Sequence, residues 1–286
     1  MKKNLVFILN GVVKNAYAKE KVLQLIPNRK LTSANPVVLW QHVMPTEIKQ
    51  SSDAKIVEPH PHRGFATVTF MLQGEGYHYD NAGHETILKP GDVQYLFAGS
   101  GILHCENPSA RFAGLGGTYE LLQLWLNVPA KFKMDQPVYQ SAVKVAIPVI
   151  VDELGVNLRL PIGHYKGAKG PIETKQPIIA ITGEIHNNHD VCLEVPAGNW
   201  ALLYVANGSV TLNDDEDNPV HEHQLAVLDK EREELKITAN GNAQILFLSA
   251  PPLDEPLVIK DNFVMNTKEE IDQAMADVAA GKFGEI

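Results

Sequence analysis

The sequence has few cysteines, no long apolar run and a shortage of positive charge. Only Cys105 and Cys192 occur among 286 residues, too few for the disulfide framework of a small secreted domain. No apolar stretch approaches the roughly 20 residues that a membrane-spanning helix needs. The formal net charge is -9, from 25 basic and 34 acidic residues, which argues against the basic surface used for direct nucleic-acid binding. We therefore expect a cytoplasmic protein without membrane or direct nucleic-acid contacts.

The N-terminus contains parts of a secretion signal, but in an interrupted form. An apolar run over residues 5–9 follows two lysines, and residues 16–18 imitate a signal-peptidase site. Asn10 and Gly11 break the apolar run before that site. We expect an ordinary N-terminal β-strand here.

Short apolar segments separated by turn residues predict a β-rich protein. The chain has 18 prolines and 21 glycines, and its apolar runs are rich in β-branched and aromatic residues. Strands are predicted over residues 37–40, 67–72, 93–97, 121–127, 142–151, 178–182, 201–206, 209–212, 225–228, 235–238 and 244–248. Asn207-Gly208 and Asn240-Gly241 predict hairpin turns, because both residue types tolerate positive φ.

A helix is predicted only near the C-terminus. Thr267 and Glu270 form a possible capping box, the apolar residues that follow have helical spacing, and Gly281 fits a helix stop. A segment with two prolines, residues 129–137, is the predicted boundary between two β-rich halves. The predicted domains are residues 1–136 and 137–286, each a sandwich or barrel, with the helix at the end of the second.

One group of residues has the spacing of a metal site. His60-Pro61-His62 and His104-Cys105-Glu106 each place two donor side chains at positions i and i+2, which share one face of a strand. Cys105 should then point away. Three imidazoles and a carboxylate suit iron, and also manganese, nickel, copper or zinc. The pairs His78/His84, His186/His189 and His221/His223 are interpreted as coincidental.

Several longer motifs resemble the pirin family. They are His60–Phe65, Thr67–Val68, Gly91–Gln94, Ala98–His104, Gln123–Ala130, Leu253–Pro256 and Phe263–Thr267. The resemblance covers most of the chain from about Val38 to Gly284.

The resemblance implies a bicupin, that is, two antiparallel β-barrels of the cupin class, of which the N-terminal one holds the metal, generally iron. Its ligands correspond to His60, His62, His104 and Glu106. Pirins often carry glutamate where this chain has Ala66, and tryptophan is common at the position of Tyr95. These differences bear on substrate fit more than on metal binding.

Two functions from different classes follow from the resemblance. The first is a quercetin 2,3-dioxygenase, in which Fe(II) and O2 open a flavonol ring. Glu106 would take the proton of the 3-hydroxyl group. Phe65, Phe97 and Leu103 are candidates for the apolar wall of the substrate pocket. A related interpretation is that the natural substrate is another small enol or phenol. The alternative is a non-enzymatic, metal-dependent regulator that binds a transcription factor or a metabolic enzyme.

Overall fold

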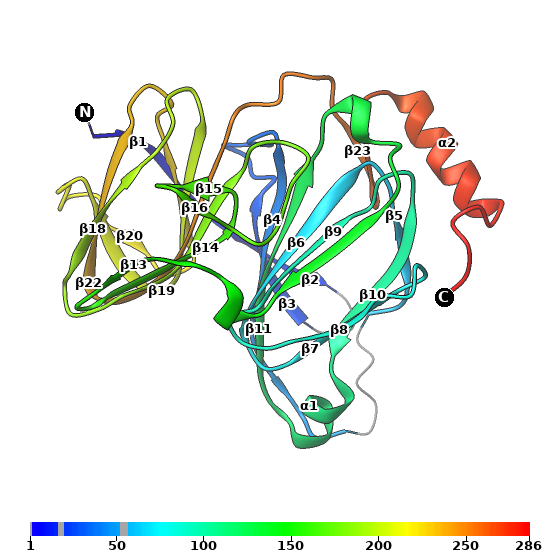
Figure 1. Ribbon diagram of the computed structural model, residues 1–286, viewed down its shortest axis with the longest axis horizontal. Helices are drawn as coiled ribbons and strands as arrows, with labels where there is room; N and C mark the ends of the chain where they lie inside the picture. Colours follow the sequence, from blue (N-terminus) through cyan, green and yellow to red (C-terminus); the bar gives the residue numbers. More distant parts are fainter. Residues whose placement is uncertain (1, 17–19, 52–56) are drawn as a thin grey trace. The chain divides into compact units, whose positions relative to one another are not determined.

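The computed structural model describes residues 2–16, 20–51 and 57–286, and most of its regular structure is β-strand (Figure 1). The chain forms two compact units that interleave in sequence. The N-terminal unit comprises Val13–Pro27, Asn35–Lys144 and Leu253–Ile286; the C-terminal unit comprises Met1–Val12, Asn28–Ala34 and Val145–Pro252. The predicted all-β fold with a short C-terminal helix is confirmed.

The N-terminal unit contains two larger antiparallel sheets. One has four strands in the order β5-β10-β7-β8, and the other has seven in the order β12-β9-β6-β11-β4-β3-β2. A small sheet, β23-β24, accompanies them. The strands are β2 (Val12–Ala16), β3 (Glu20–Ile26), β4 (Val37–Ile48), β5 (His60–His62), β6 (Phe65–Gln73), β7 (Gly76–Asp80), β8 (Glu85–Leu88), β9 (Val93–Phe97), β10 (Ile102–Pro108), β11 (Gly117–Asn127), β12 (Val138–Ala142), β23 (Val258–Lys260) and β24 (Phe263–Met265).

The C-terminal unit is built on a nine-stranded sheet. Its main path is β1-β21-β19-β22-β17-β14-β13, with β18 paired to β22 and β20 paired to β19, and β15-β16 form a separate pair. The strands are β1 (Leu5–Asn10), β13 (Val149–Glu153), β14 (Val156–Ile162), β15 (His164–Tyr165), β16 (Ala168–Lys169), β17 (Ile179–Ile185), β18 (Asp190–Glu194), β19 (Trp200–Leu212), β20 (Val220–His221), β21 (Gln224–Leu228) and β22 (Glu234–Ala250). Alternate residues of these strands form one apolar core.

The predicted N-terminal strand is confirmed as β1, which pairs with β21. Residues 17 and 18, in the sequence that imitates a signal-peptidase site, lie outside the described residues. In the described part of the chain, no helix is long and apolar enough to cross a membrane.

The two Asn-Gly pairs do not form the predicted hairpins. They lie inside the long strands β19 and β22. Gly208 pairs with Ala243 and Val210 pairs with Ala239, so the three residues 240–242 of β22 lie opposite the single residue Ser209 of β19. Gly208 and Gly241 have φ values of 79° and 92°. Positive φ serves a bulge as well as a turn, and bulges let long strands bend. The Asn-Gly pairs therefore do mark positions of positive φ, but these positions are bulges within strands and not hairpin turns.

Two further expectations differ from the structure. The strand predicted over residues 142–151 is divided, because β12 ends at Ala142, a 3-10 turn follows over Lys144–Ala146, and β13 begins at Val149. Val145, in that turn, is largely exposed despite its strand propensity. The sequence also gave no indication of the six-residue helix α1 (Ala110–Leu115), which is capped by Ser109 and too short to show helical periodicity.

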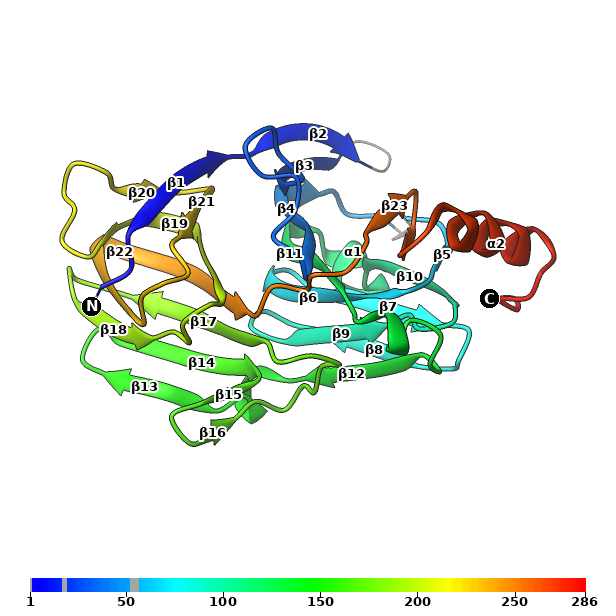
Figure 2. The same cartoon turned by 90° about the horizontal axis from the view of Figure 1, so that it is seen from above.

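The C-terminal helix α2 (Lys268–Ala279) begins with the predicted capping box, since Thr267 and Glu270 make both reciprocal hydrogen bonds. Its buried residues Ile271 and Ala274 join an apolar cluster with Phe263, Met265 and Phe283. The helix therefore packs beside β23 and β24 in the N-terminal unit (Figure 2), whereas the division at residue 136 had assigned it to the second domain.

We expect Thr267→Ala to lower the stability of the N-terminal unit by about 1 kcal/mol, because the helix loses its side-chain cap. In a thermal unfolding curve this corresponds to a fall in midpoint of about 2–4 °C for a unit of this size. Lys268→Ala, at an exposed neighbouring position, is the control and should leave the midpoint unchanged. Equal midpoints for both variants would contradict the capping assignment.

Candidate metal centre

The pairing of β5 with β10 brings the two predicted donor pairs together. In the antiparallel register, His104 lies opposite His60 and Ile102 lies opposite His62. Alternation then directs His60, His62 and His104 to one face of the sheet. Residues more than forty positions apart thus become neighbours on adjacent strands of one sheet, whereas the spacing predicted only a shared face within each pair.

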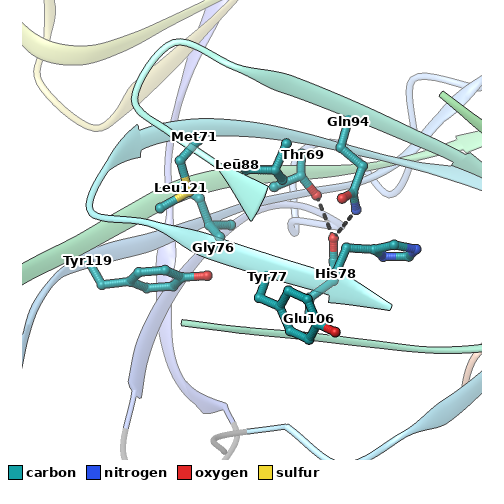
Figure 3. A pocket seen from close by; sticks show the side chains of 10 residues that line it. All are labelled: Thr69, Met71, Gly76, Tyr77, His78, Leu88, Gln94, Glu106, Tyr119 and Leu121. Carbon is teal, nitrogen blue, oxygen red and sulfur yellow. Dashed lines mark hydrogen bonds between the residues drawn. The ribbon is translucent and has the colours of Figure 1, made fainter. Parts of the chain in front are cut away.

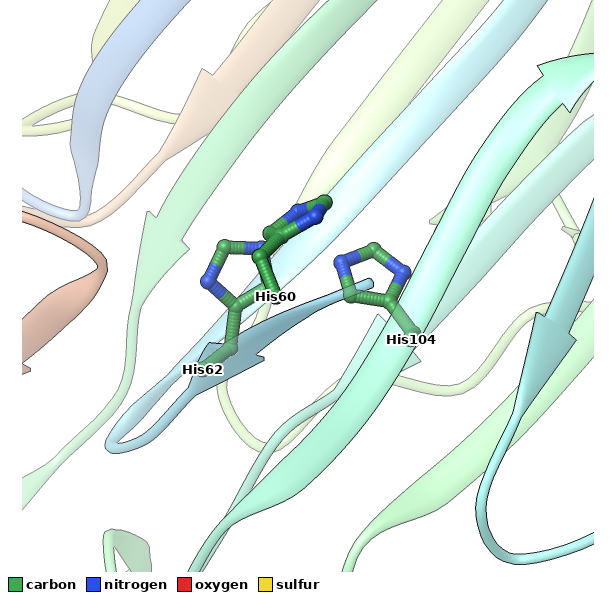
Figure 4. A group of neighbouring side chains, drawn as sticks. All are labelled: His60, His62 and His104. Carbon is green, nitrogen blue, oxygen red and sulfur yellow. The ribbon is translucent and has the colours of Figure 1, made fainter. Parts of the chain in front are cut away.

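The three imidazole rings surround a common point (Figure 4). Ring centroids lie 4.8 Å apart for His60 and His62, 4.5 Å for His60 and His104, and 4.7 Å for His62 and His104. One ring nitrogen from each residue lies within 4.8 Å of the other two. Nitrogens bound to one ion at about 2.1 Å lie roughly 3.0–3.4 Å apart, so small rotations of the rings would bring the three nitrogens to binding distance.

Hydrogen bonds to the backbone orient two of these rings. Nδ1 of His60 lies 2.9 Å from the carbonyl oxygen of Glu58, and Nδ1 of His62 lies 3.3 Å from that of Asn262. Because a carbonyl only accepts, each Nδ1 carries the proton and donates, and each Nε2 keeps its lone pair. Such outer hydrogen bonds typically fix the tautomer of metal-binding histidines.

Burial keeps the inner rings neutral. His62 is 2% exposed and His104 is fully buried. Loss of hydration, together with repulsion from His60, lowers the pKa of His62 to about 3, and burial and the neighbouring histidines hold the pKa of His104 well below its usual value. Neutral imidazole is the form that binds metals, so His62 and His104 need release no proton to bind an ion at physiological pH.

Glu106, the fourth predicted ligand, is not in the three-histidine group. Its carboxylate points across the barrel interior and accepts hydrogen bonds from Thr69 and Gln94 (Figure 3), and from Gln123. These three partners lie side by side on β9, β6 and β11, because Thr69 pairs with both glutamines. Glu106 groups instead with His104 and with His78.

His78 was missed as a site residue. On β7 it is fully buried, between the buried residues Gly76 and Asp80, and its ring centroid lies 5.6 Å from that of His104. The available signal was the alternation of β7, which places His78 and Asp80 on one face. From the sequence, His78 was paired with His84 across a turn, and the strand face that His78 shares with Asp80 was not considered.

Arg63, the residue after His62, attaches this segment to the C-terminal helix. Its guanidinium pairs with Asp277 at 2.8 Å, donates to the carbonyl oxygen of Ser100 at 2.6 Å and lies 4.7 Å over the ring of Phe283. A buried pair of this kind makes the position of the histidine segment depend on residues more than two hundred positions away.

Lys133 joins the same two segments from another side. Its buried ammonium donates to the carbonyl oxygens of Gly64 at 2.7 Å and Val264 at 2.8 Å, and to Asn127 at 2.5 Å; burial lowers the pKa of Lys133 to about 8. Gly64 is required by this close approach, because a Cβ there would lie 2.2 Å from the oxygen of Val264. The C-terminal segment is thus part of the support of the site.

The remaining candidates have different surroundings. Phe65 contacts His62, with centroids 4.9 Å apart, and Trp125, at 4.6 Å, so it forms an apolar wall beside the ring. Phe97 is fully buried in the core, and Leu103 packs near the C-terminal helix. Cys105 is buried, with its thiol 2.9 Å from the carbonyl oxygen of Val57.

The residues present fit a divalent metal ion. Both ring nitrogens of His104 are buried without a hydrogen-bond partner in the described structure, which is costly unless something binds them. Three imidazoles beside a carboxylate are a mixed nitrogen and oxygen donor set, of the kind that binds iron and other first-row transition metals.

Comparisons with known proteins agree with the motifs. The family model Pirin matches residues 18–126, and the model of the Pirin C-terminal cupin domain matches residues 180–284. A Pseudomonas aeruginosa protein named "putative quercetin 2,3-dioxygenase" is 37% identical over 90% of this chain and 92% of its own length. A crystal structure of quercetin 2,3-dioxygenase from Acinetobacter baumannii covers 100% of both chains, with 35% identity and a TM-score of 0.94. Bacterial pirin YhhW from Escherichia coli in complex with nickel(II) is 16% identical over 86% of this chain and 99% of its own, with a TM-score of 0.67, a likeness of fold alone.

The low pKa of His62 predicts acid sensitivity of the metal-free protein. The folded-state pKa of His62, about 3, lies below the pKa of about 6.5 of an unperturbed histidine, so between these pH values the unfolded chain binds a proton that the folded chain does not. Stability should therefore fall on acidification through this window, by up to about 1.4 kcal/mol per pH unit from His62 alone. Urea unfolding at pH 7, 6 and 5 measures it. His62→Asn should flatten the slope; identical slopes in both proteins would refute the assignment.

Proposed function

The chain belongs to the pirin family, and from that premise we propose that it is a metal-dependent dioxygenase that opens a flavonol of the quercetin type with O2. The predicted bicupin fold is confirmed by the family models and the structural match. The observation that carries the proposal is the convergence of three imidazoles on one point, beside a carboxylate held by three donors. The relatives named as quercetin dioxygenases support the choice of substrate.

The proposed cofactor is Fe(II), held by His60, His62 and His104 with Glu106 as the carboxylate of the site. An ion bound there supplies Lewis-acid polarisation and a redox-active centre for reaction with O2. The nickel(II) in the Escherichia coli pirin supports binding of a divalent metal by a protein of this fold. Manganese, nickel, copper and zinc suit the same donor set and remain comparison metals for the assay.

Glu106 is proposed as the base that accepts the proton of the flavonol 3-hydroxyl group. Its two carboxylate oxygens accept hydrogen bonds from Gln94, Gln123 and Thr69, which fix the direction of the remaining lone pairs. Fixed orientation matters because proton transfer requires a base within hydrogen-bond reach of the hydroxyl group.

The burial of the site residues favours one side for substrate entry. His60 and Glu106 are partly exposed, whereas His62 and His104 are buried. Phe65 and Trp125 pack beside His62 and give this part of the site an aromatic wall. Aromatic side chains suit a flat aromatic ligand and exclude water from the reacting atoms.

The proposal assigns the protein to the cytoplasm, where Cys105 and Cys192, which form no disulfide, would stay reduced. A different small enol or phenol as the natural substrate would use the same residues in the same roles. The regulatory alternative, in which the metal-loaded protein binds a protein partner, is treated as an outcome of the test below.

We expect Glu106→Gln to lower flavonol turnover by about 100-fold to 10,000-fold, the usual contribution of a general base, while the three histidines retain the ion. Loss of the flavonol absorption band under O2 measures turnover, and elemental analysis measures metal. Glu85→Gln, at an exposed carboxylate on β8, is the control and should keep wild-type turnover.

Wild-type protein loaded in turn with iron, manganese, nickel, copper and zinc should turn over at least one flavonol of a panel. Complete inactivity with every metal, together with a stoichiometric protein partner recovered only by the metal-loaded form, would overturn the dioxygenase proposal in favour of the regulatory one.

A further inference from the structure

The C-terminal unit contains a hollow that takes no part in the metal centre. Its volume is about 480 Å3, within the range of about 300–1,000 Å3 that is typical of small-molecule sites. All of its lining residues lie between Gly163 and Ser249, inside the C-terminal unit. A second hollow of about 450 Å3 adjoins it, since His164, Ile179 and Pro196 line both. The C-terminal unit therefore has room for a ligand of its own.

A short hairpin forms one wall of this hollow. Its strands β15 and β16 are joined by Lys166 and Gly167, whose φ values of 45° and 84° are those of a two-residue turn with both φ positive. The hydroxyl group of the buried Tyr165 accepts a hydrogen bond from the backbone N–H of Glu194 at 2.9 Å, which ties the hairpin to β18. The hairpin also contacts β14 (Figure 2). The wall is thus anchored to two strands of the main sheet.

Backbone contacts fix the loop that follows the hairpin. The N–H of Gly170 donates to the carbonyl oxygen of Gly163 at 2.8 Å, and the N–H of Ile172 donates to that of Pro161 at 3.2 Å. Gly170 is required by this close approach, because a Cβ there would lie 2.8 Å from the backbone nitrogen of Ile162. A cavity that is already formed in this way loses little free energy to ordering when a ligand enters.

The inner part of the hollow is apolar except for one buried polar pair. Ile172 and Ile178 are each 2% exposed. Ser249, near the end of β22, is fully buried, and its hydroxyl oxygen accepts a hydrogen bond from the side-chain amide of Asn199 at 3.2 Å. In the described structure this leaves the hydroxyl proton of Ser249 and the amide oxygen of Asn199 available to a ligand. One donor beside one acceptor suits a hydroxyl group, which both accepts and donates.

The outer part of the hollow carries more positive than negative charge. Lys169 and Lys175 line it together with one carboxylate, Glu173, which pairs with Lys169 at 2.5 Å. Lys169 and Glu173 are exposed, and Lys175 is half-buried. In a chain with a net charge of -9, a local excess of one positive charge favours a ligand with one negative charge. A carboxylate has that charge, whereas a phosphate monoester carries close to two.

We propose that this hollow binds a small carboxylic acid that has an apolar body and a hydroxyl group. The carboxylate lies at the exposed end beside the two lysines, the body packs on the isoleucines, and the hydroxyl group donates to Asn199 and accepts from Ser249. The inference goes beyond the proposed function, because no lining residue belongs to the N-terminal unit and neither the metal ion nor O2 takes part.

Three matched probes test the three parts of this ligand. 4-Hydroxybenzoate has all of them, benzoate lacks the hydroxyl group, and 4-hydroxybenzamide lacks the charge. Calorimetric titration of the metal-loaded protein should show saturable binding of 4-hydroxybenzoate, with a dissociation constant in the millimolar range or below for a ligand of this size. Benzoate and 4-hydroxybenzamide should bind more weakly. The metal-free protein should give the same three values, because the hollow lies outside the metal centre.

Substitutions then assign each part to its residue. Ser249→Ala should weaken 4-hydroxybenzoate by roughly 2–10-fold, the contribution of one hydrogen bond, and leave benzoate unchanged. Lys175→Gln should weaken both carboxylates by about 2–5-fold, as loss of one exposed ion pair does, and leave 4-hydroxybenzamide unchanged. Lys30→Gln is the control, because this exposed lysine of the same unit lines neither hollow. Thermal unfolding checks that each variant is folded.

Crystals of the wild-type protein soaked in 4-hydroxy-3-iodobenzoate locate the ligand without any variant. The anomalous signal of iodine should lie among the residues that line the hollow. An iodine signal only at the metal centre would overturn the proposal, as would titrations in which 4-hydroxybenzoate shows no saturable binding up to its solubility limit. A protein that binds 4-hydroxybenzoate in the hollow but turns over no flavonol would refute the proposed function and leave this inference standing.

Discussion

The chemistry of this protein depends on the pairing of one strand, β10, with a different neighbour on each side. On one side His104 faces His60 of β5, and on the other Glu106 faces His78 of β7. Because side chains alternate along a strand, a shift of the register by one residue would turn every donor to the wrong face. The backbone hydrogen bonds of three strands thus assemble the site before any ion is bound.

The barrel interior gives these side chains their properties. Burial keeps the imidazoles of His62 and His104 neutral, and Gln94, Gln123 and Thr69 of the opposite sheet fix the carboxylate of Glu106. A preorganised arrangement of neutral donors and a fixed carboxylate suits both metal binding and proton abstraction, because little reorganisation is needed in either step.

Sequence reasoning succeeded where the signal was local and periodic. The spacing of His60 with His62 and of His104 with Glu106 predicted donors on shared strand faces, and the capping box at Thr267 predicted the start of α2. It failed where one local signal fits two structures. Asn-Gly at 207–208 and 240–241 serves bulges in β19 and β22, because positive φ is common to bulges and hairpins. His78 escaped notice because its partners come from other strands.

The sequence by itself determined the family, the β-rich fold and the identity of the three clustered histidines, since these follow from motif and alternation. Only the tertiary structure decided that Glu106 lies beside His78 and not within the three-histidine group, because that depends on which strands flank β10. It alone also showed that residues 253–286 support the site through Arg63 and Lys133. Contacts between segments two hundred residues apart are set by packing of the whole barrel, and no local pattern encodes them.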